Sequence, residues 1–223
     1  HPLSRRQRQM CIRDRFIAIG LNYSDHAAEV GADIPKEPIV FMKATSCIVG
    51  PNDDVEIVSG SKKLDWEVEL GIIIGKEAKH ISENQSQDHI LGYCLVNDVS
   101  EREWQLEKMG QWVKGKSHDT YGPVGPHLVT KDEISDVNNL KMSLDVNGKR
   151  MQTGNTSTMI FNVDVIVSYL SKYMTLLPGD IITTGTPPGV GMGMKPQQFL
   201  KAGDMMKLSV ENLGEQNSKV VAL

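Results

Sequence analysis

The sequence predicts a mainly β protein of the α+β class, folded as one mixed domain over residues 16–223. Short apolar stretches typical of strands outnumber the stretches with helical periodicity. Strand and helix patterns do not follow the regular β–α–β order that builds a doubly wound parallel sheet. The chain also shows no internal repeat and no linker, so we expect a single domain.

The first half of this domain is expected to contain mostly strands. Residues 16–19 form a short apolar run, and residues 22–30 are a predicted helix with Ser24 or Asp25 as its N-cap. A second short helix is expected at residues 100–108. Further strands are predicted at residues 39–42, 55–58, 65–75 and 90–98.

The second half is expected to open with a β-hairpin. Asn147-Gly148 is a strong signal for a type I′ turn, because both central residues of that turn need positive φ angles. Residues 162–173 carry apolar side chains on one helical stripe, which indicates an amphipathic helix. The predicted strands of this half are residues 140–145, 150–152, 181–184, 206–210 and 219–222.

The composition is that of an ordinary globular protein and argues against several functional classes. The chain has 223 residues and a net charge of −4, which disfavours a general nucleic-acid binder. No apolar run approaches the roughly 20 residues that a membrane helix needs, so we expect neither a nucleic-acid nor a membrane partner. The three cysteines are widely spaced and form no CxxC pair, which indicates reduced thiols and a cytoplasmic location.

Residues 1–15 differ in composition from the rest of the chain. They hold five of the seven arginines and one aspartate, so the segment has a net charge of +4. Since the whole chain has a net charge of −4, residues 16–223 have a net charge of −8. The segment shows neither helical nor strand periodicity and lacks the apolar stretch of a secretory signal. We therefore expect a non-native or disordered leader, in preference to a basic arm for nucleic acid.

Three carboxylates at the ends of predicted strands form a candidate metal site. The alternation in DWEVE places Glu67 and Glu69 on one face of a strand that continues as a buried run. Asp98 ends a second apolar strand in the same manner. Carboxylates that enter a core need a compensating cation, and three of them without a nearby His or Cys suit Mg²⁺, Mn²⁺ or Ca²⁺. The alternative is a solvated strand face.

Three further features are ambiguous by themselves. His26 and Glu29 share one helix face, which fits either a surface ion pair or a general base oriented by a carboxylate. Lys116 lies in a loop-like stretch where a lone lysine is usually solvated. GTPPGVG at residues 185–191 lacks the GK[ST] ending of a phosphate loop, so we exclude nucleotide binding there. Its threonine can still present a hydroxyl and backbone N–H groups to a carboxylate.

Five motifs in order identify a family resemblance that runs from about Phe16 to the C-terminus. They are GLNYSDHAAE (20–29), DWEVELGIIIG (65–75), VNDVSEREWQ (96–105), KGKSHDTYGPVGP (114–126) and PGDIITTGTPPGVG (178–191). The chain resembles the fumarylacetoacetate hydrolase family, and within it the bacterial 2,4-diketo-3-deoxy-L-fuconate or rhamnonate hydrolases. This resemblance implies a mixed β-roll or sandwich with flanking helices, usually assembled as a homodimer.

The resemblance also assigns roles to residues of this sequence. The metal-ligand positions of the family, expected to hold Mg²⁺ with Mn²⁺ or Ca²⁺ as alternatives, fall on Glu67, Glu69 and Asp98. Its catalytic positions, a His–Glu dyad on a lid helix and a lysine, fall on His26, Glu29 and Lys116. Its substrate-contacting positions fall on Arg102, Gln105 and Thr186.

The implied reaction is metal-dependent hydrolysis of the C3–C4 bond of a 2,4-dioxo acid, which gives pyruvate and a short carboxylic acid. The expected partner is therefore a small 2-oxo acid substrate. Relatives with the same metal site decarboxylate or tautomerise oxaloacetate, isomerise dienoates or cleave ureidoglycolate, and these reactions remain alternatives. A non-catalytic metal-binding protein is disfavoured, because such a protein would need only the metal ligands and not His26, Glu29 and Lys116.

Overall fold

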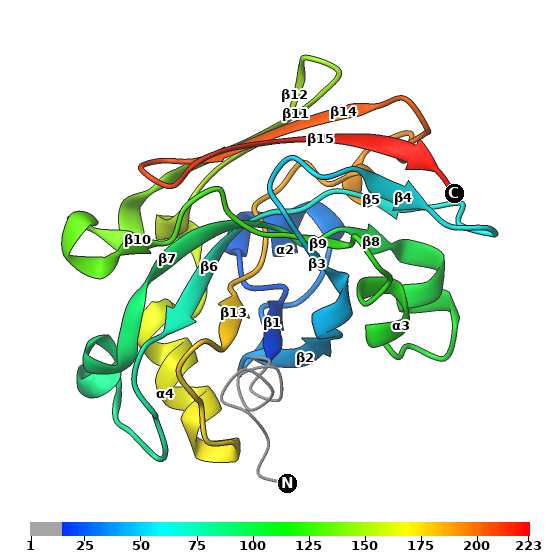
Figure 1. Cartoon of the computed structure of the whole chain (residues 1–223). Coiled ribbons are helices and arrows are strands. Elements are labelled where there is room, and N and C mark those ends of the chain that lie inside the picture. The colour runs from blue at the N-terminus through cyan, green and yellow to red at the C-terminus, as the bar shows by residue number, and fades with distance from the viewer. Residues whose placement is uncertain (1–14) are drawn as a thin grey trace, which may run out of the picture.

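The computed structural model describes residues 15–223, and it confirms the mainly β architecture expected from the sequence. Most strands belong to two large sheets, one of six and one of five strands (Figure 1). Residues 1–14 of the predicted leader lie outside the described residues. Arg15 is described, and its backbone N–H and Nε donate to Asp180 Oδ1 over 2.9 and 3.1 Å.

The six-stranded sheet has the order β10-β7-β6-β13-β1-β2. Its strands are β1 (Phe16–Gly20), β2 (Ile39–Lys43), β6 (Val68–Ile74), β7 (Ile90–Asn97), β10 (Val129–Thr130) and β13 (Ile181–Thr183). β1 and β13 are parallel, whereas the other neighbouring pairs are antiparallel. β6 lies near the middle of the sheet and is buried along its whole length, which explains its continuous apolar sequence.

The five-stranded sheet has the order β12-β11-β14-β15-β4 and lies across the top of the molecule in Figure 1. Its strands are β4 (Val55–Ile57), β11 (Lys141–Val146), β12 (Lys149–Asn155), β14 (Met205–Val210) and β15 (Gly214–Ala222). β11 and β14 pack on β6, and β15 packs on β7, so the main core lies between the two sheets. The predicted hairpin is confirmed, with φ angles of 52° at Asn147 and 77° at Gly148.

Four very short strands form two small ribbons beside the large sheets. They are β3 (Ile48–Val49) paired with β9 (Gly122–Pro123), and β5 (Leu64–Asp65) paired with β8 (Ser100–Glu101). The 3₁₀ turns are η1 (Thr45–Cys47), η2 (Glu83–His89), η4 (Lys131–Glu133), η5 (Val137–Asn139), η6 (Thr156–Thr158) and η7 (Gly191–Gly193).

The helices of the described residues are short: α2 (Ser24–Val30), α3 (Val113–Lys116) and α4 (Val163–Tyr173). Of the three predicted helices, those that correspond to α2 and α4 are confirmed, but the N-cap of α2 is Tyr23 and not Ser24 or Asp25. Asn162 caps α4 by accepting from the Val165 N–H over 3.0 Å. The helix expected at residues 100–108 is instead the π-helical turn η3 (Glu103–Glu107).

The predicted strand 65–75 is interrupted, because β5 ends at Asp65 and β6 begins at Val68. The interruption has a tertiary cause. Trp66 Nε1 donates to the Gly189 carbonyl over 3.0 Å, and Asp65 Oδ1 accepts from the Gly191 N–H over 2.7 Å. These contacts turn the chain toward the 189–191 loop before it enters the sheet.

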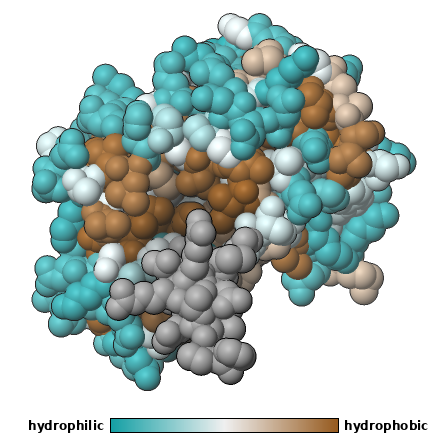
Figure 2. Space-filling model, in the orientation of Figure 1, coloured by the Kyte–Doolittle hydropathy of each residue, from teal (hydrophilic) through white to brown (hydrophobic). Residues whose placement is uncertain are grey.

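The surface in Figure 2 divides by hydropathy. Hydrophilic residues predominate in the upper part of this view, where β14 and β15 lie, apart from a hydrophobic patch at the upper right, and hydrophobic residues gather in a hollowed region over the six-stranded sheet. The helices within residues 15–223 include none that combines the length and the apolar character needed to cross a membrane.

Candidate active site

A cavity of about 250 Å³ lies where the six-stranded sheet meets α2, η3 and α3. Eight of the nine predicted site residues line it, and the ninth, Glu29, contacts one of them. The lining has two chemically distinct parts. The charged lining consists of His26, Glu67, Glu69, Asp98, Arg102 and Lys116. The apolar lining is formed mainly by Ile19, Val30, Ile39, Phe41, Leu106 and Trp112.

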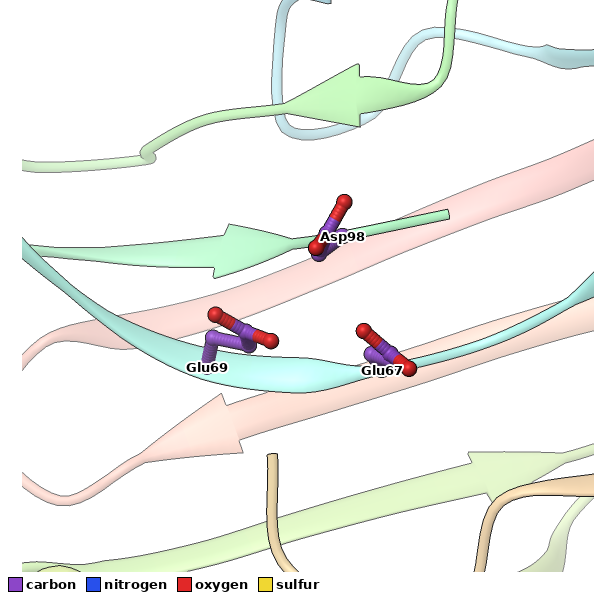
Figure 3. A group of neighbouring side chains, drawn as sticks. All are labelled: Glu67, Glu69 and Asp98. Carbon is purple, nitrogen blue, oxygen red and sulfur yellow. The ribbon is translucent and has the colours of Figure 1, made fainter. Parts of the chain in front are cut away.

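Three buried carboxylates converge in the charged lining (Figure 3). Glu67 precedes β6, Glu69 is its second residue, and Asp98 directly follows β7. The Asp98 N–H donates to the Glu67 carbonyl over 3.0 Å, which places the two residues opposite each other. One carboxylate oxygen of each residue lies within 4.8 Å of the others, so the three can share one ion.

Three cations surround two of these carboxylates. Lys116 Nζ lies 2.7 Å from Glu67 Oε2 and 2.7 Å from Asp98 Oδ2, while Lys43 pairs with the other Asp98 oxygen. Arg102 Nη2 lies 2.7 Å from Glu67 Oε1. Although burial alone would raise the pKa of Glu67, the charges of Lys116 and Arg102 lower that pKa to about 2. Glu67 is therefore ionised at any physiological pH.

Glu69 differs from its two neighbours, because no cation within residues 15–223 forms an ion pair with it. Its carboxylate accepts from the Thr183 hydroxyl and from the Gly185 N–H, the latter over 2.9 Å. Burial and the negative charges of Asp98 and Glu67 raise the pKa of Glu69 well above its usual range. Of the three carboxylates, Glu69 thus lacks a neutralising positive charge from the described residues. A divalent cation bound by the carboxylate oxygens would supply that charge.

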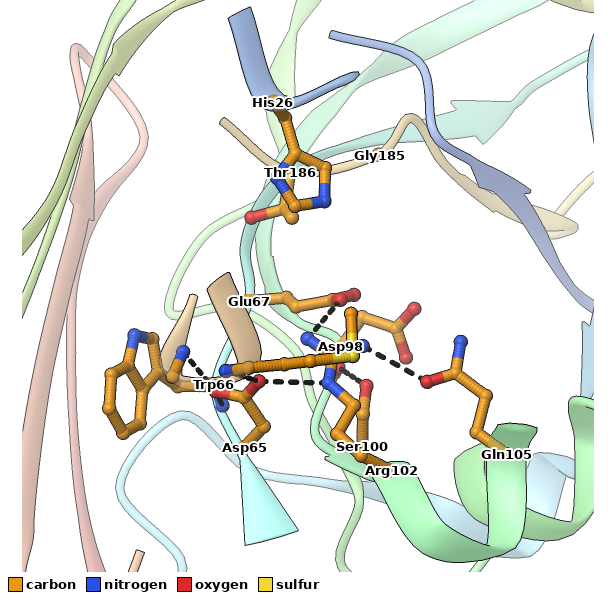
Figure 4. Close-up of polar contacts among 12 residues, drawn as sticks. His26, Asp65, Trp66, Glu67, Asp98, Ser100, Arg102, Gln105, Gly185 and Thr186 are labelled. Carbon is orange, nitrogen blue, oxygen red and sulfur yellow. Dashed lines mark hydrogen bonds and ion pairs between the residues drawn. The ribbon is translucent and has the colours of Figure 1, made fainter. Parts of the chain in front are cut away.

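His26 and Glu29 form a pair on α2, with Nδ1 and Oε2 separated by 2.9 Å. Glu29 Oε1 also accepts from the Gly189 N–H over 2.8 Å, so the carboxylate is fixed on both sides. When Nδ1 carries the proton that Glu29 accepts, Nε2 holds the lone pair. In Figure 4 the imidazole lies beside Thr186 and faces the same space as Glu67.

Arg102 and Gln105 are buried and joined, with Arg102 Nη1 donating to Gln105 Oε1 over 3.0 Å (Figure 4). Among the described residues, Arg102 Nη2 has an ion-pair partner but no hydrogen-bond acceptor, which leaves a buried donor at the cavity. The Thr186 hydroxyl donates to the Val68 carbonyl over 3.0 Å and accepts from Gln152 Nε2 over 2.8 Å. These bonds hold the Thr186 side chain in place at the cavity wall.

Asp65 is a site residue that was not predicted from the sequence. It is fully buried, and its Oδ2 accepts from Arg102 Nε over 2.8 Å and from the Met192 N–H over 3.0 Å. Its Oδ1 accepts from the Gly191 N–H. Asp65 therefore connects the Arg102 side chain to the loop that also holds Glu29. The one available signal is a third carboxylate in DWEVE, placed just before the predicted metal ligands.

Lys43 is the second unpredicted residue. Its buried ammonium group pairs with Asp98 and donates to the Tyr121 carbonyl over 2.9 Å. It ends β2, where a lysine after the apolar residues Ile39–Met42 is the only sequence signal. The partner in the ion pair lies 55 residues away along the chain, so only the fold shows that this lysine is an internal counter-ion.

Comparison with known proteins gives concordant matches over nearly the whole chain. The profile of the fumarylacetoacetate (FAA) hydrolase C-terminal family matches residues 15–221. A Burkholderia lata protein described only as a hydrolase is 61% identical over 203 residues, which are 91% of this chain and 72% of that protein.

Two solved structures show similarity to different kinds of enzyme. A fumarylacetoacetate hydrolase from Exiguobacterium antarcticum superposes with a TM-score of 0.87 at 39% identity, covering 94% of this chain and 76% of that one. A 2-hydroxyhepta-2,4-diene-1,7-dioate isomerase from Mycobacterium marinum superposes with a TM-score of 0.82 at 37% identity, covering 95% and 75%. The same fold therefore accompanies both a hydrolase and an isomerase.

Proposed function

The chain belongs to the fumarylacetoacetate hydrolase family, and from this premise we propose that it hydrolyses the C3–C4 bond of a 2,4-dioxo acid. The products are pyruvate and a short carboxylic acid, and 2,4-diketo-3-deoxy-L-fuconate is one substrate of this class. The observation that supports the proposal is the convergence of three buried carboxylates, a His–Glu pair and a buried lysine around one cavity of about 250 Å³.

Glu67, Glu69 and Asp98 are the residues that would hold the divalent cation of this reaction, for which we propose Mg²⁺. Their donor atoms are all carboxylate oxygens, and Glu69 has no cation partner among the described residues. When bound, the ion supplies a Lewis acid for the oxygens of the 2-oxo acid.

His26 acts as the general base in this proposal. Glu29 accepts from Nδ1, fixes the tautomer and stabilises the imidazolium that forms when Nε2 takes a proton from water. The oxygen of that water then bonds to C4 of the substrate. Because Gly189 fixes Glu29 from the other side, the imidazole keeps its orientation through the proton transfer.

Lys116 stabilises the negative charge that develops on the C4 oxygen. Burial alone would lower its pKa, but the charges of Asp98 and Glu67 raise the pKa overall, so the amine stays protonated at neutral pH. The C3–C4 bond then breaks, its electron pair passes to C3 as the enolate of pyruvate, and the proton held by His26 moves to C3. Arg102, Gln105 and Thr186 orient the substrate.

The proposal is tested by incubating the purified full chain with a panel of 2,4-dioxo acids in Mg²⁺ or Mn²⁺. Loss of the diketone absorbance should coincide with pyruvate release, and both should stop when a chelator is added. The Lys116→Met variant is the control that tests whether the observed reaction takes place at this cavity. Absence of pyruvate with every diketo acid in either metal would refute the proposed reaction.

The similarity to the M. marinum isomerase favours a second candidate, the isomerisation of a dienoate at the same carboxylates. Decarboxylation or tautomerisation of oxaloacetate and cleavage of ureidoglycolate are further alternatives. Incubation with oxaloacetate and with a 2-hydroxydienoate, followed by product analysis, separates these reactions from C–C hydrolysis. An isomerase would convert the dienoate without releasing pyruvate from any acylpyruvate.

The proposal places the enzyme in the cytoplasm as a homodimer that acts on a small 2-oxo acid. The buried free thiols of Cys47 and Cys94 are consistent with a reducing compartment. Light scattering of the purified chain measures the oligomeric state directly.

A further inference from the structure

The lining of the cavity also indicates the chemical nature of the part of the substrate beyond C4, here called the tail. Resting on the proposed function, we propose that this site selects 2,4-dioxo acids whose tail is short and uncharged, and that it rejects tails ending in a carboxylate. Four observations support this specificity: the order of side chains along β2, the nature of the apolar lining, the pairing of the cations around the cavity, and the size of the cavity.

The order of side chains along β2 gives the direction of the tail. Ile39, Phe41 and Lys43 are two residues apart, so they lie on one face of the strand at steps of about 7 Å. Lys43 pairs with Asp98 in the charged lining, and Lys116 Nζ lies 5.3 Å from the centre of the Phe41 ring. From Asp98, which Lys43 contacts, toward Ile39, the cavity wall therefore changes from charged to apolar.

Aromatic packing gives the apolar lining a fixed shape. The Trp112 ring meets the Phe41 ring edge to face, with 5.2 Å between their centres. Gly20, which pairs with Ile39 in the sheet, leaves room for this indole, because a Cβ there would lie 2.3 Å from Trp112 Cζ3. The part of the wall beyond Phe41 is thus a preformed surface of ring and alkyl carbons, which favours apolar tails.

The two cations that line the cavity are already paired with carboxylates of the protein. The two lining cations are Arg102, which pairs with Asp65 and Glu67, and Lys116, which pairs with Glu67 and Asp98. In the part of the chain that the structure describes, no further lysine or arginine lines the cavity. A tail carboxylate would therefore enter an apolar region without a counter-ion, which is strongly unfavourable.

The size of the cavity limits the length of the tail. Its volume of about 250 Å³ lies below the roughly 300–1,000 Å³ of pockets for drug-sized ligands. Part of this space must hold the dioxo acid itself, so the tail has room for only a few carbons. The substrate in the name of the M. marinum isomerase is a 1,7-dioate, with a carboxylate at each end. The inferred specificity thus separates this chain from that isomerase.

The test uses 2-oxo acids that lack the C4 carbonyl and so cannot undergo the proposed cleavage. Calorimetric titration of the Mg²⁺-loaded protein compares 2-oxohexanoate with 2-oxoadipate, two ligands of equal length that differ only in a terminal methyl or carboxylate. We expect at least tenfold tighter binding of 2-oxohexanoate. From pyruvate to 2-oxopentanoate, affinity should rise by up to about fourfold per added methylene.

A substitution that adds a cation should reverse the preference. Ile39→Arg places a guanidinium in the apolar lining, and it should improve 2-oxoadipate binding at least tenfold while weakening 2-oxohexanoate. Leu128→Arg is the matched control, because Leu128 is an exposed leucine outside the cavity lining. Circular dichroism and the melting temperature verify that both variants fold. If Ile39→Arg does not fold, the comparison of equal-length ligands on the unaltered protein decides the question.

The outcomes distinguish this inference from the proposed function. Equal or tighter binding of 2-oxoadipate would overturn the inferred specificity, even if diketo acids are hydrolysed. Preferential binding of alkyl 2-oxo acids without any diketo acid hydrolysis would support the inferred specificity and refute the proposed reaction.

Discussion

Replacing Glu69 with Gln should stabilise the metal-free protein, although it removes a proposed metal ligand. Glu69 is buried beside two other carboxylates and forms no ion pair with any residue of the described chain. A glutamine is nearly isosteric, and its carbonyl oxygen can still accept from Thr183 and from the Gly185 N–H. The substitution therefore removes charge repulsion while keeping the hydrogen bonds.

The size of the effect follows from the separation of the charges. The candidate ligand atoms of Glu67, Glu69 and Asp98 lie within 4.8 Å of one another. Two unit charges at that distance repel by about 3.5 kcal/mol at an effective dielectric constant of ~20, and Lys116 offsets part of this repulsion. We expect the free energy of unfolding to rise by roughly 1–3 kcal/mol. For a domain of this size the melting temperature rises by about 2–4 °C per kcal/mol.

Glu67→Gln is the matched control, because it alters the neighbouring carboxylate with the opposite expected sign. Glu67 pairs with Lys116 and with Arg102, each over 2.7 Å. Removing one partner of a buried pair typically costs about 3–5 kcal/mol. Both variants should lose the stabilisation by Mg²⁺, which for the unaltered protein is about 2.7 kcal/mol at 100 times the dissociation constant.

The assay is thermal and urea unfolding of each protein with a chelator and with Mg²⁺. In chelator, Glu69→Gln should unfold later than the unaltered protein and Glu67→Gln earlier. If both substitutions shift stability in the same direction, the assignment of Glu69 as the uncompensated charge is wrong. If Glu69→Gln retains full Mg²⁺ stabilisation, Glu69 is not a ligand.

The stabilisation should also depend on pH in a defined direction. Burial and the charges of Asp98 and Glu67 raise the pKa of Glu69, so the folded state holds this proton more tightly than the unfolded chain does. Below the pKa of about 4.3 that a glutamate has in the unfolded chain, the carboxyl is neutral in both the folded and the unfolded state. At such pH the Glu69→Gln substitution should raise the free energy of unfolding only a little. As the pH rises through the raised pKa of Glu69 in the folded protein, the unaltered protein loses stability. The difference in stability between Glu69→Gln and the unaltered protein therefore grows.

Three further predictions concern other residues. His26→Ala should lower turnover by about 10²–10⁴-fold while calorimetry shows unchanged Mg²⁺ affinity, and full turnover would remove His26 from the mechanism. Asp65→Asn should destabilise the protein by about 3–5 kcal/mol in urea unfolding, since it leaves Arg102 without its fully buried partner; an unchanged midpoint would contradict this. Burial raises the pKa of Cys47 to about 11 and that of Cys94 to about 12, so iodoacetamide at pH 8 should modify neither thiol until urea is added. Peptide mass spectrometry measures this, and rapid labelling of either native thiol would show the burial to be wrong.

Features controlled by neighbouring residues could be predicted from the sequence. The turn at Asn147-Gly148 follows from two positive φ angles that these residue types adopt readily. The common direction of Glu67 and Glu69 follows from the two-residue period of an extended chain, and it persists although β6 itself begins only at Val68.

Features controlled by distant residues could not be predicted in this way. The break between β5 and β6 depends on contacts of Asp65 and Trp66 with residues 189–191, more than 120 positions away. The π-helical form of η3 accompanies the close approach of Gly115, where a Cβ would lie 2.5 Å from the Gln105 backbone nitrogen. The role of Lys43 depends on a partner in another strand.

The division of the cavity wall has a consequence for the evolution of enzymes built this way. In the charged lining, Glu67 and Asp98 each pair with two cations, so a change at one position disturbs several others. In the apolar lining, side chains such as Ile39 and Leu106 act through shape and hydrophobicity, and they can be exchanged one at a time. Substitutions in the apolar lining can therefore change which substrate tail is accepted, while the residues that carry out the reaction stay the same.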